Sequence, residues 1–261
     1  MTRTSVVTGA ASGIGKATAE HLRAQGHTVL GVDIQGADII ADLSTDEGRA
    51  SLVEQADRLS GGRLDGVIAV AGLVAPNPVT VSVNYFGAKA TLEGLQPLLA
   101  KSDAPRAAVV SSMGALVDVH DALLARLLAD DEPGAIAEAE RLGTEIMETG
   151  MSPIYGTTKN GIARYVRAHA KDEMWAGAGI ALNAIAPGVI ETPMIAATLA
   201  TEEGRAAMAK GAPAPYNGPA APPAAPAALL AWLTSEENTF VTGQVIFIDG
   251  GAESILRPEL V

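Results

Sequence analysis

The sequence predicts one α/β domain, built on a doubly wound parallel sheet of about seven strands with helices on both faces. Short β-branched runs alternate with longer helical patterns along most of the 261 residues, which is typical of βαβ units. The strand-like runs are almost continuously apolar, as expected for a parallel sheet covered on both faces. No fixed-period repeat and no linker divides the chain, so we expect residues 1–261 to form a single domain.

Seven runs of apolar and β-branched residues are expected to form the strands. They are Thr4–Thr8, Thr28–Asp33, Asp38–Ala41, Gly66–Ala71, Ala107–Ser111, Ile180–Ile185 and Gln244–Ile248. Helix-like segments lie between them at about 13–25, 44–60, 78–100, 155–177 and 224–236. Two stretches, near 118–150 and 190–225, interrupt this alternation.

The first of these stretches is acidic. Residues 118–148 hold nine acidic and two basic side chains, a net charge of −7 out of −12 for the whole chain. Apolar residues repeat there at helical spacing in two groups, and Pro133-Gly134 separates the groups. The groups are Leu123, Leu124, Leu127 and Leu128, and then Ile136, Leu142, Ile146 and Met147. We therefore expect an inserted helical hairpin near 118–150.

The second stretch is rich in proline. Six prolines between Ala212 and Pro226 predict an irregular loop before the last helix. A mobile substrate lid over 190–225 and a static proline-rich connector both fit this composition, and the sequence does not separate them.

The composition excludes several classes of protein. The net charge of −12 argues against nucleic acid, whose phosphates would be repelled. Without cysteine there is no disulfide, thiolate metal site or cysteine nucleophile, and the four histidines lack ligand spacing, so we expect no metal. The longest apolar stretch, Val67–Ala75, is too short to span a bilayer, and no signal-type region opens the chain. We expect a cytoplasmic protein with no membrane partner.

A glycine-rich turn follows the first expected strand. Residues 8–15 read Thr-Gly-Ala-Ala-Ser-Gly-Ile-Gly and run directly into a helix. Glycine permits a tight turn and close approach of the backbone, and the free N–H groups at the start of a helix attract a pyrophosphate. The turn therefore predicts a dinucleotide site.

Asp33 ends the second strand, 18 residues after Gly15, where a carboxylate accepts hydrogen bonds from an adenosine ribose. This carboxylate would repel the 2′-phosphate of NADP, and neither Ser12 nor residues 34–36 offer a Lys or Arg, so NAD is favoured. A plain turn residue at the strand end is the alternative for Asp33. Asp42 and Leu43 are expected to flank the adenine, although a helix N-cap fits Asp42 or Ser44 as well.

The i, i+4 spacing of Tyr155 and Lys159 places both on one face of a helix. A phenol has a pKa of about 10, and lowering it by about three units requires roughly 4 kcal/mol, which a nearby ammonium and a bound cofactor would supply. Ser111 and Ser112 end a buried strand, where open α/β sheets bind ligands. A serine there can hydrogen-bond a substrate oxygen. Asn84 lies in an apolar helical segment, where its simplest role is a buried amide that bonds the backbone.

Taken together, these residues resemble the short-chain dehydrogenase/reductase family, whose members have a Rossmann fold. The family's glycine motif matches residues 8–15, and its Tyr-x-x-x-Lys matches 155–159. Residues 183–192 resemble its nicotinamide-side loop, and 248–251 resemble its carboxy-terminal strand and turn. The resemblance covers essentially the whole chain.

The resemblance implies a role for each matched polar residue. Tyr155 would be the general acid/base, and Lys159 would lower its pKa and hold the nicotinamide ribose. Ser112 rather than Ser111 would orient the substrate oxygen, and Asn84 would hold a water that connects Lys159 to solvent. Ile190 and Thr192 would meet the carboxamide. Besides Tyr155 and Lys159, the expected cofactor-binding residues are Gly9, Ser12, Gly13, Ile14, Gly15, Asp33, Asp42, Leu43, Ala71, Gly72, Pro187, Gly188, Ile190 and Thr192.

Three departures from the family pattern stand out. The usual Asn-Asn-Ala-Gly reads Ala-Val-Ala-Gly at 69–72, which removes a side-chain hydrogen bond. Only twelve residues lead from Gly72 to Asn84, and 43 lead from Ser112 to Tyr155, where the family commonly has little more than a dozen. The long gap holds the acidic hairpin.

The shortened connection, the long insert and the short sequence segments at 41–44, 82–87 and 191–193 resemble those of one branch of the family, the bacterial 3α-hydroxysteroid dehydrogenase/carbonyl reductases. That branch implies NAD-linked interconversion of a ring hydroxyl and a ketone on a steroid or another hydrophobic carbonyl compound, and the Ala, Pro and Met residues at 194–226 suit an apolar substrate. Another ketone, a diol or an acyl substrate is the alternative, and a non-catalytic NAD sensor is a remote one. Because the hairpin directly precedes the Tyr155 helix, we expect a homodimer or homotetramer with an altered contact.

Overall fold

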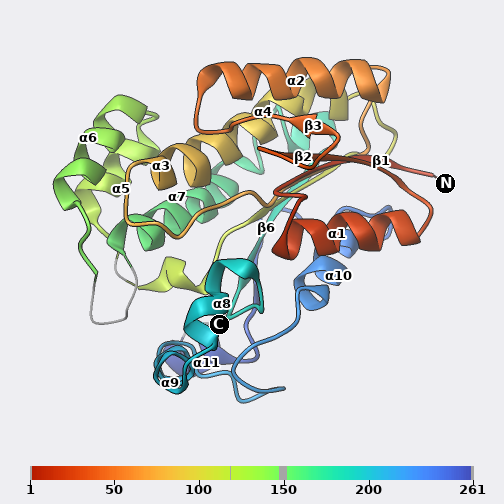
Figure 1. Ribbon diagram of the computed structural model, residues 1–261. Helices are drawn as coiled ribbons and strands as arrows, with labels where there is room; N and C mark the ends of the chain where they lie inside the picture. Colours follow the sequence, from red (N-terminus) through yellow and green to blue (C-terminus); the bar gives the residue numbers. More distant parts are fainter. Residues whose placement is uncertain (1, 118, 147–151, 260–261) are drawn as a thin grey trace.

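The computed structural model describes residues 2–117, 119–146 and 152–259. Within them, seven parallel strands form one sheet in the order β3-β2-β1-β4-β5-β6-β7 (Figure 1). The strands are β1 (Thr4–Thr8), β2 (Thr28–Asp33), β3 (Ile39–Ile40), β4 (Gly66–Ala69), β5 (Arg106–Val110), β6 (Ala181–Pro187) and β7 (Val245–Ile248). The strand order reverses between β1 and β4, the point at which doubly wound sheets bind ligands. The predicted fold class is confirmed.

Helices cover both faces of the sheet. Figure 1 shows α2 (Asp46–Ser60) and α4 (Ala88–Leu99) on one face and α1 (Gly13–Ala24) and α10 (Ala224–Leu233) on the other. Helix α7 (Pro153–His169) lies on the same face as α2 and α4.

Successive strand residues point to opposite faces, as the pleat of a β-strand requires. Val6 and Val67 pack under α2, α4 and α7, and their neighbours Val7 and Ile68 pack under α1 and α10. The two apolar cores explain why the strand sequences are continuously apolar instead of alternating.

Two expected helices are interrupted. The segment expected at 78–100 is α3 (Val79–Val81), then a π-helical turn η1 (Ser82–Gly87), then α4. A π-turn holds one more residue per turn than an α-helix and is frequent at functional sites. The segment expected at 155–177 begins earlier, at Pro153, and its regular part ends at His169, before a short 3₁₀ turn η3 (Ala176–Ala178).

The insert is a helical hairpin within the described residues. It contains α5 (Asp121–Leu128) and α6 (Glu132–Leu142), and α5 packs against α7 through Leu123 and Leu127. The expected break at Pro133-Gly134 is wrong, because Pro133 lies in the first turn of α6, where its missing N–H costs nothing.

The end of the second expected helix of the insert is also wrong in part. Helix α6 ends at Leu142, with Gly143 at positive φ after it, and Ile146 is exposed outside the helix. Met147 lies outside the described residues.

The region expected as a lid contains a 3₁₀ turn η4 (Pro193–Ile195), α8 (Ala196–Leu199) and α9 (Glu202–Gly211), and none of these three elements contributes a buried residue. The base of the region is attached, since Ala212 packs with Met113 and Ala252 of α11 (Ala252–Leu256). Met113 belongs to a 3₁₀ turn, η2 (Met113–Leu116), that follows β5.

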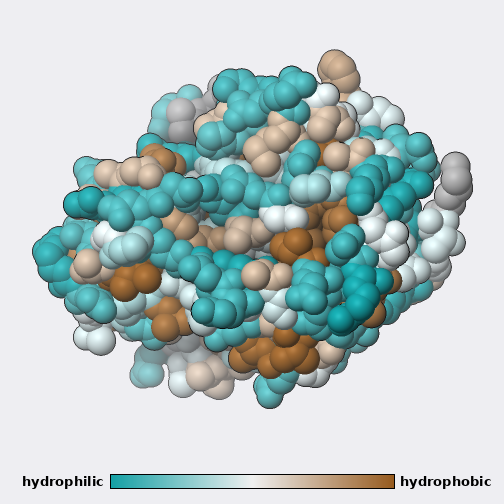
Figure 2. Space-filling view, turned by 90° about the horizontal axis from the view of Figure 1, so that it is seen from above, coloured by the Kyte–Doolittle hydropathy of each residue, from teal (hydrophilic) through white to brown (hydrophobic). Residues whose placement is uncertain are grey.

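The described part of the chain contains no helix that is long and apolar enough to cross a membrane. Viewed from the α2 side, the surface is largely hydrophilic, and its hydrophobic residues lie in separate patches (Figure 2).

Candidate active site

The glycine-rich turn between β1 and α1 has the backbone that the sequence predicts. Gly9 and Gly13 have positive φ values of 68° and 52°. A Cβ on Gly15 would overlap the carbonyl of Gly9, and a Cβ on Gly9 would lie 3.1 Å from the backbone of Ala71. Side chains at these positions would therefore disrupt the turn or displace the segment that follows β4.

The start of α1 is open to a ligand. Ser12 is its N-cap, is exposed, and makes no side-chain cap hydrogen bond. The first amides of a helix have no acceptor within the helix, and together with the helix dipole they favour an anionic group. Ile14 points the other way and packs on the core beneath α1. These features fit the pyrophosphate of a dinucleotide.

Asp33 lies beside this turn at the carboxyl end of β2. Its Oδ2 accepts a hydrogen bond from the amide of Ala11 (3.0 Å), and its Oδ1 accepts one from the amide of Ile34 (2.8 Å). None of the ion pairs between described residues involves Asp33. The carboxylate is thus placed at the glycine turn with no cation beside it.

Thr8 connects the turns after β1 and β4. Its Oγ1 accepts hydrogen bonds from the amides of Val70 (2.9 Å) and Ala71 (3.0 Å). The sequence indicated that a side-chain hydrogen bond is lost where Asn-Asn-Ala-Gly reads Ala-Val-Ala-Gly. The threonine hydroxyl ties this segment to β1 instead.

Asp42 and Leu43 lie in different environments. Leu43 is 5% exposed and packs in the core, so its side chain is not available to an adenine. Asp42 is exposed and accepts hydrogen bonds from the amide and the hydroxyl of Ser44, which lower its pKa. Neither Asp42 nor Ser44 caps α2, because that position belongs to Thr45, whose Oγ1 accepts the amide of Gly48.

The nicotinamide-side loop follows β6. Pro187 ends the strand, and Gly188 approaches Asp249 so closely that a Cβ would lie 2.8 Å from the Asp249 Cα. Ile190 is buried and forms a parallel bridge with Ala221.

Thr192 brings this loop to the glycine-rich turn. A Cβ on Gly13 would lie 3.1 Å from its Cγ2. The loop after β6 and the turn after β1 are thereby brought together across the carboxyl ends of the strands.

Ser112 and Tyr155 meet at the end of β5. Ser112 is 9% exposed, and its Oγ accepts the amide of Gly114 (3.0 Å). Burial raises the pKa of Tyr155, and a hydrogen bond with Ser112 opposes that rise. Ser111 is directed elsewhere, because its Oγ donates to the carbonyl of Lys159 (2.8 Å). The structure thus favours Ser112 over Ser111 as the serine of the site.

Lys159 is buried (4% exposed), and its Nζ donates to the carbonyl of Val110 (2.9 Å). Burial lowers the pKa of Lys159 to about 8. No ion pair between described residues involves Lys159, so burial acts on this ammonium without a carboxylate to balance it.

The expected acidification of Tyr155 is not found in the protein alone. The Lys159 ammonium donates to a backbone carbonyl and is not among the groups that shift the tyrosine pKa. Desolvation therefore dominates, and the phenol is protonated at neutral pH. The sequence expectation also included the field of a bound cofactor, which would act on this raised starting value.

Asn84 lies in the π-turn and is 1% exposed. Its Oδ1 accepts the amide of Leu73 (2.7 Å), and its Nδ2 donates to the Leu73 carbonyl (2.9 Å) and to Thr158 Oγ1 (3.3 Å). This is the buried amide that bonds the backbone, one of the two roles expected for it.

Gly72 shows that Asn84 and Lys159 lie close together. A Cβ at position 72 would be 3.2 Å from Asn84 Oδ1 and 3.2 Å from Lys159 Nζ. A side chain at position 72 would require both polar groups to shift by a few tenths of an ångström. The catalytic residues expected from the sequence are therefore brought together from η1, from the end of the segment that follows β5, and from α7; they are Asn84, Ser112, Tyr155 and Lys159.

Sequence reasoning did not assign roles to Thr8 and Thr158. Both lie within the motifs at 8–15 and 155–159, and their side chains join motifs that are distant in the chain. A threonine hydroxyl at a strand end or on a helix gives no sequence signal of its partner.

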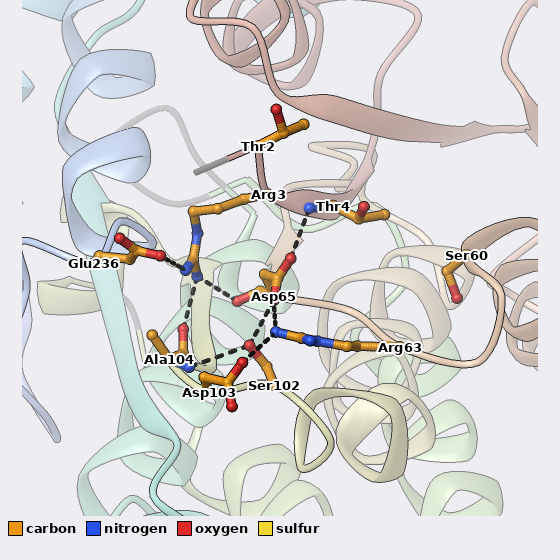
Figure 3. Close-up of a pocket in the computed structure, with 10 residues that line it drawn as sticks. All are labelled: Thr2, Arg3, Thr4, Ser60, Arg63, Asp65, Ser102, Asp103, Ala104 and Glu236. Carbon is orange, nitrogen blue, oxygen red and sulfur yellow. Dashed lines mark hydrogen bonds and ion pairs between the residues drawn. The ribbon is translucent and has the colours of Figure 1, made fainter.

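A separate pocket of about 340 Å³ lies away from this site. It is lined by residues at the amino ends of the strands, among them Arg3, Asp65 and Ser102 (Figure 3). Hydrogen bonds and ion pairs join its charged side chains to one another, and none of the residues placed above reaches it.

Comparisons with known proteins agree on one family. A family model described as enoyl-(acyl carrier protein) reductase matches residues 9–253. A 3-alpha-hydroxysteroid dehydrogenase/carbonyl reductase from Comamonas testosteroni is 38% identical, over 97% of each chain. A cis-4-hydroxycyclohexanecarboxylate dehydrogenase from Sinomonas cyclohexanicum is 31% identical, again over 97% of each chain. The solved structure of a 3-alpha-hydroxysteroid dehydrogenase from Pseudomonas sp. B-0831, complexed with NADH, is 36% identical and superimposes with a TM-score of 0.87, covering 99% of this chain and 100% of that one.

Proposed function

Because the chain belongs to the short-chain dehydrogenase/reductase family of oxidoreductases, we propose that it uses NAD to interconvert a secondary alcohol and a ketone on a hydrophobic cyclic substrate. The first candidate substrate is a 3α-hydroxysteroid or the matching 3-ketosteroid. The observation that carries the proposal is the meeting of Ser112, Tyr155 and Lys159 at the carboxyl end of β5.

The dinucleotide would be held by the glycine turn, by Asp33 and by the loop at 187–192. When bound, its nicotinamide ring accepts or donates the hydride. As a phenolate, Tyr155 would take the hydroxyl proton during oxidation. As the protonated phenol that burial favours, it gives its proton to the carbonyl oxygen during reduction. Ser112 hydrogen-bonds the same oxygen as charge develops on it. Asn84, next to Lys159 Nζ, holds the water through which Lys159 exchanges a proton with solvent.

NAD is proposed over NADP because of Asp33. Its carboxylate stands at the glycine turn without a cation, so a 2′-phosphate would meet a negative charge there. The related dehydrogenase solved with NADH supports the same preference.

The steroid is supported by relatives, and it is the finer part of the proposal. Two of the similar proteins are named for 3-alpha-hydroxysteroids, and one is named for a substituted cyclohexane. These substrates share a secondary alcohol on a hydrophobic ring. A non-steroid ketone, a diol or an acyl substrate remains the second candidate.

We also propose that the protein assembles as a homodimer or homotetramer with an altered contact. Helix α5 of the insert packs on α7, the helix that carries Tyr155 and Lys159, and thereby covers part of its outer surface. The molar mass in solution, from light scattering, tests this proposal, and a monomer would contradict it.

Replacing Tyr155 by Phe tests the chemistry. We expect turnover to fall by about 10³-fold, within the range for losing a general acid/base. Binding of NADH, measured by the increase in NADH fluorescence, should be retained. A panel of 3α- and 3β-hydroxysteroids, cyclic diols and aromatic ketones tests the substrate. Turnover of each compound is measured from the absorbance of reduced NAD. Activity confined to non-steroids would remove the steroid proposal, and full activity of the Phe variant would remove the mechanism. A non-catalytic sensor would bind NADH and turn over no substrate.

A further inference from the structure

Arg49 lies in the first turns of α2, and its guanidinium is almost fully enclosed. The side chain is 10% exposed, although α2 has a mostly polar outer surface. All three of its nitrogens donate. Nε donates to the carbonyl of Leu43 (2.9 Å), and Nη2 donates to the carbonyl of Ser82 (3.0 Å). Nη1 and Nη2 together grip both carboxylate oxygens of Glu132 (2.6 and 2.7 Å).

The partners of Arg49 belong to three separate segments of the chain. Leu43 follows Asp42 in the segment expected beside the adenine. Ser82 opens the π-turn that carries Asn84, and Glu132 opens α6 of the insert. The planar guanidinium has five donors in a fixed fork, so it can bond two carbonyls and both oxygens of one carboxylate, whereas a lysine ammonium has only three donors on a single nitrogen.

Two of these segments are in direct contact, and a cavity of about 670 Å³ lies beside them, lined among others by Arg49, Ser82 and Glu132. A Cβ on Gly87, the last residue of the π-turn, would lie 2.8 Å from the Leu43 carbonyl oxygen and 3.0 Å from the Leu43 Cβ. The π-turn and the adenine-side segment are therefore in direct contact, and Arg49 bridges them from outside.

A movement of the π-turn would reach the reacting groups. Asn84 bonds Leu73 from this turn, and its Oδ1 and the Lys159 Nζ each lie 3.2 Å from the position that a Gly72 Cβ would take. Loss of the Arg49 bridge would thus displace both the adenine-side segment and Asn84.

We propose that Arg49 is a positioning residue, through which the insert fixes the segment beside the adenine and the π-turn that carries Asn84. The inference rests on the proposed function. It assigns to the insert a role in cofactor binding and turnover that is separate from any role in assembly.

The experiment compares four variants with the wild type: Arg49→Met, Arg49→Lys, Glu132→Gln and Asp46→Asn. Asp46 is the matched control, because it also contacts Arg49 Nη1 (3.2 Å) but is 92% exposed and lies on α2 itself. Each variant is measured for the Kd of NADH by fluorescence, for kcat, for the pH profile of kcat and for Tm.

We expect Arg49→Met to raise the Kd of NADH about tenfold and to lower kcat by roughly 10- to 100-fold, since small displacements of catalytic groups are this costly. Its pH profile should also shift, because Asn84 moves relative to Lys159. Glu132→Gln should show the same changes at roughly a third of the size, since a neutral acceptor replaces the charge. Arg49→Lys should remain impaired, and Asp46→Asn should match the wild type.

A purely structural ion pair predicts different results. It would lower Tm and the active fraction, leaving the Kd of NADH and the pH profile unchanged in the folded protein. Folded Arg49→Met or Glu132→Gln with wild-type Kd and pH profile would overturn the inference, as would full rescue by Arg49→Lys. If Arg49→Met does not fold, Glu132→Gln decides. Failure of the wild type itself to bind NADH would instead overturn the proposed function.

Discussion

The two ends of the sheet use their polar groups in different ways. At the amino ends, Arg3 donates to the carbonyls of Asp65 (2.7 Å) and Ala104 (2.8 Å), and the Asp65 carboxylate accepts from Thr4 and Ser102 (Figure 3). At the carboxyl ends, Lys159 is buried with one carbonyl as partner. At the amino ends the charged side chains pair with one another. At the carboxyl ends the Lys159 ammonium is buried without a carboxylate partner, which lowers stability. We infer that the first end serves folding and the second serves chemistry.

Replacing Lys159 by Met gives the largest expected effect. Turnover should fall by about 10³-fold, because the site loses the lysine that, in the proposed function, exchanges a proton with solvent. Stability should rise at pH 7, because holding this ammonium with a pKa of about 8 costs roughly 3 kcal/mol relative to the unfolded chain, more than the lost bond to Val110 is worth.

The gain in stability of Lys159→Met should depend on pH, because the pKa of Lys159 is lower in the folded protein than in the unfolded chain. The cost is complete below pH 8, shrinks between 8 and the unfolded pKa of about 10.5, and disappears above it. Chemical denaturation of the wild type and Lys159→Met at pH 7 and at pH 10.5 measures the difference. A variant that is less stable at pH 7 and equally so at pH 10.5 would contradict the comparison of the two ends.

Replacing Asp65 by Ala tests the amino end. Burial alone would raise the pKa of Asp65, but the hydrogen bonds from Ser102 and Thr4 and the charges of Arg3 and Arg63 outweigh it and lower the pKa. Removing the carboxylate should cost about 2–3 kcal/mol of stability, with kcat and KM unchanged. The lost stability is present above the unfolded pKa of about 4 and fades in the wild type as the pH falls below it.

Asp103 provides the control for Asp65, since it pairs with the same Arg63 at 3.0 Å but is 94% exposed. Asp103→Ala should change stability by less than about 0.5 kcal/mol. Denaturant melts compare the two variants. A loss of turnover in folded Asp65→Ala would show that the two ends are not independent.

Replacing Asp33 by Ser addresses the carboxyl end again, with a smaller effect. We expect the Kd for NAD to rise about tenfold and the preference over NADP to narrow, because both the ribose acceptor and the negative charge are lost. Calorimetric titration with each dinucleotide measures the two constants. An unchanged preference would assign the discrimination to other residues.

Replacing Gly72 by Ala gives the smallest expected effect. The added Cβ would lie 3.2 Å from both Asn84 Oδ1 and Lys159 Nζ, so these groups must separate by a few tenths of an ångström. We expect kcat to fall about fivefold, with Tm nearly unchanged. Steady-state kinetics checks this, and a wild-type kcat would mean that turnover does not depend on the exact positions of Asn84 Oδ1 and Lys159 Nζ.

The sequence predicted the sheet, its helices and the composition of the site, because these depend on local patterns. Apolar runs predict buried strands, and the motifs at 8–15 and 155–159 predict the two loops that meet at the carboxyl ends. The structure brings Asn84, Ser112, Tyr155 and Lys159 together as expected.

What the sequence did not predict depends on contacts between distant segments. Three features depend on the fold: the burial of Leu43, the two hydrogen bonds that Thr8 Oγ1 accepts from the turn after β4, and the bridge made by Arg49. The raised pKa of Tyr155 is of the same kind, since burial decides it and periodicity does not report burial of a single hydroxyl. The helix cap at Thr45 shows that adjacent Asp, Ser and Thr residues compete for one position.

The π-turn at 82–87 fixes the length of the chain at this point. One residue fewer would rotate everything beyond it by about 100° around the helix axis. Thr80 and Val81 before the turn, and Leu92, Leu95 and Leu99 after it, are all fully buried, so both sides are already committed to their orientations. A single deletion here would therefore disrupt either the packing on one side of the turn or the orientation of Asn84. We expect insertions and deletions to be tolerated in the neighbouring loops but not in this turn.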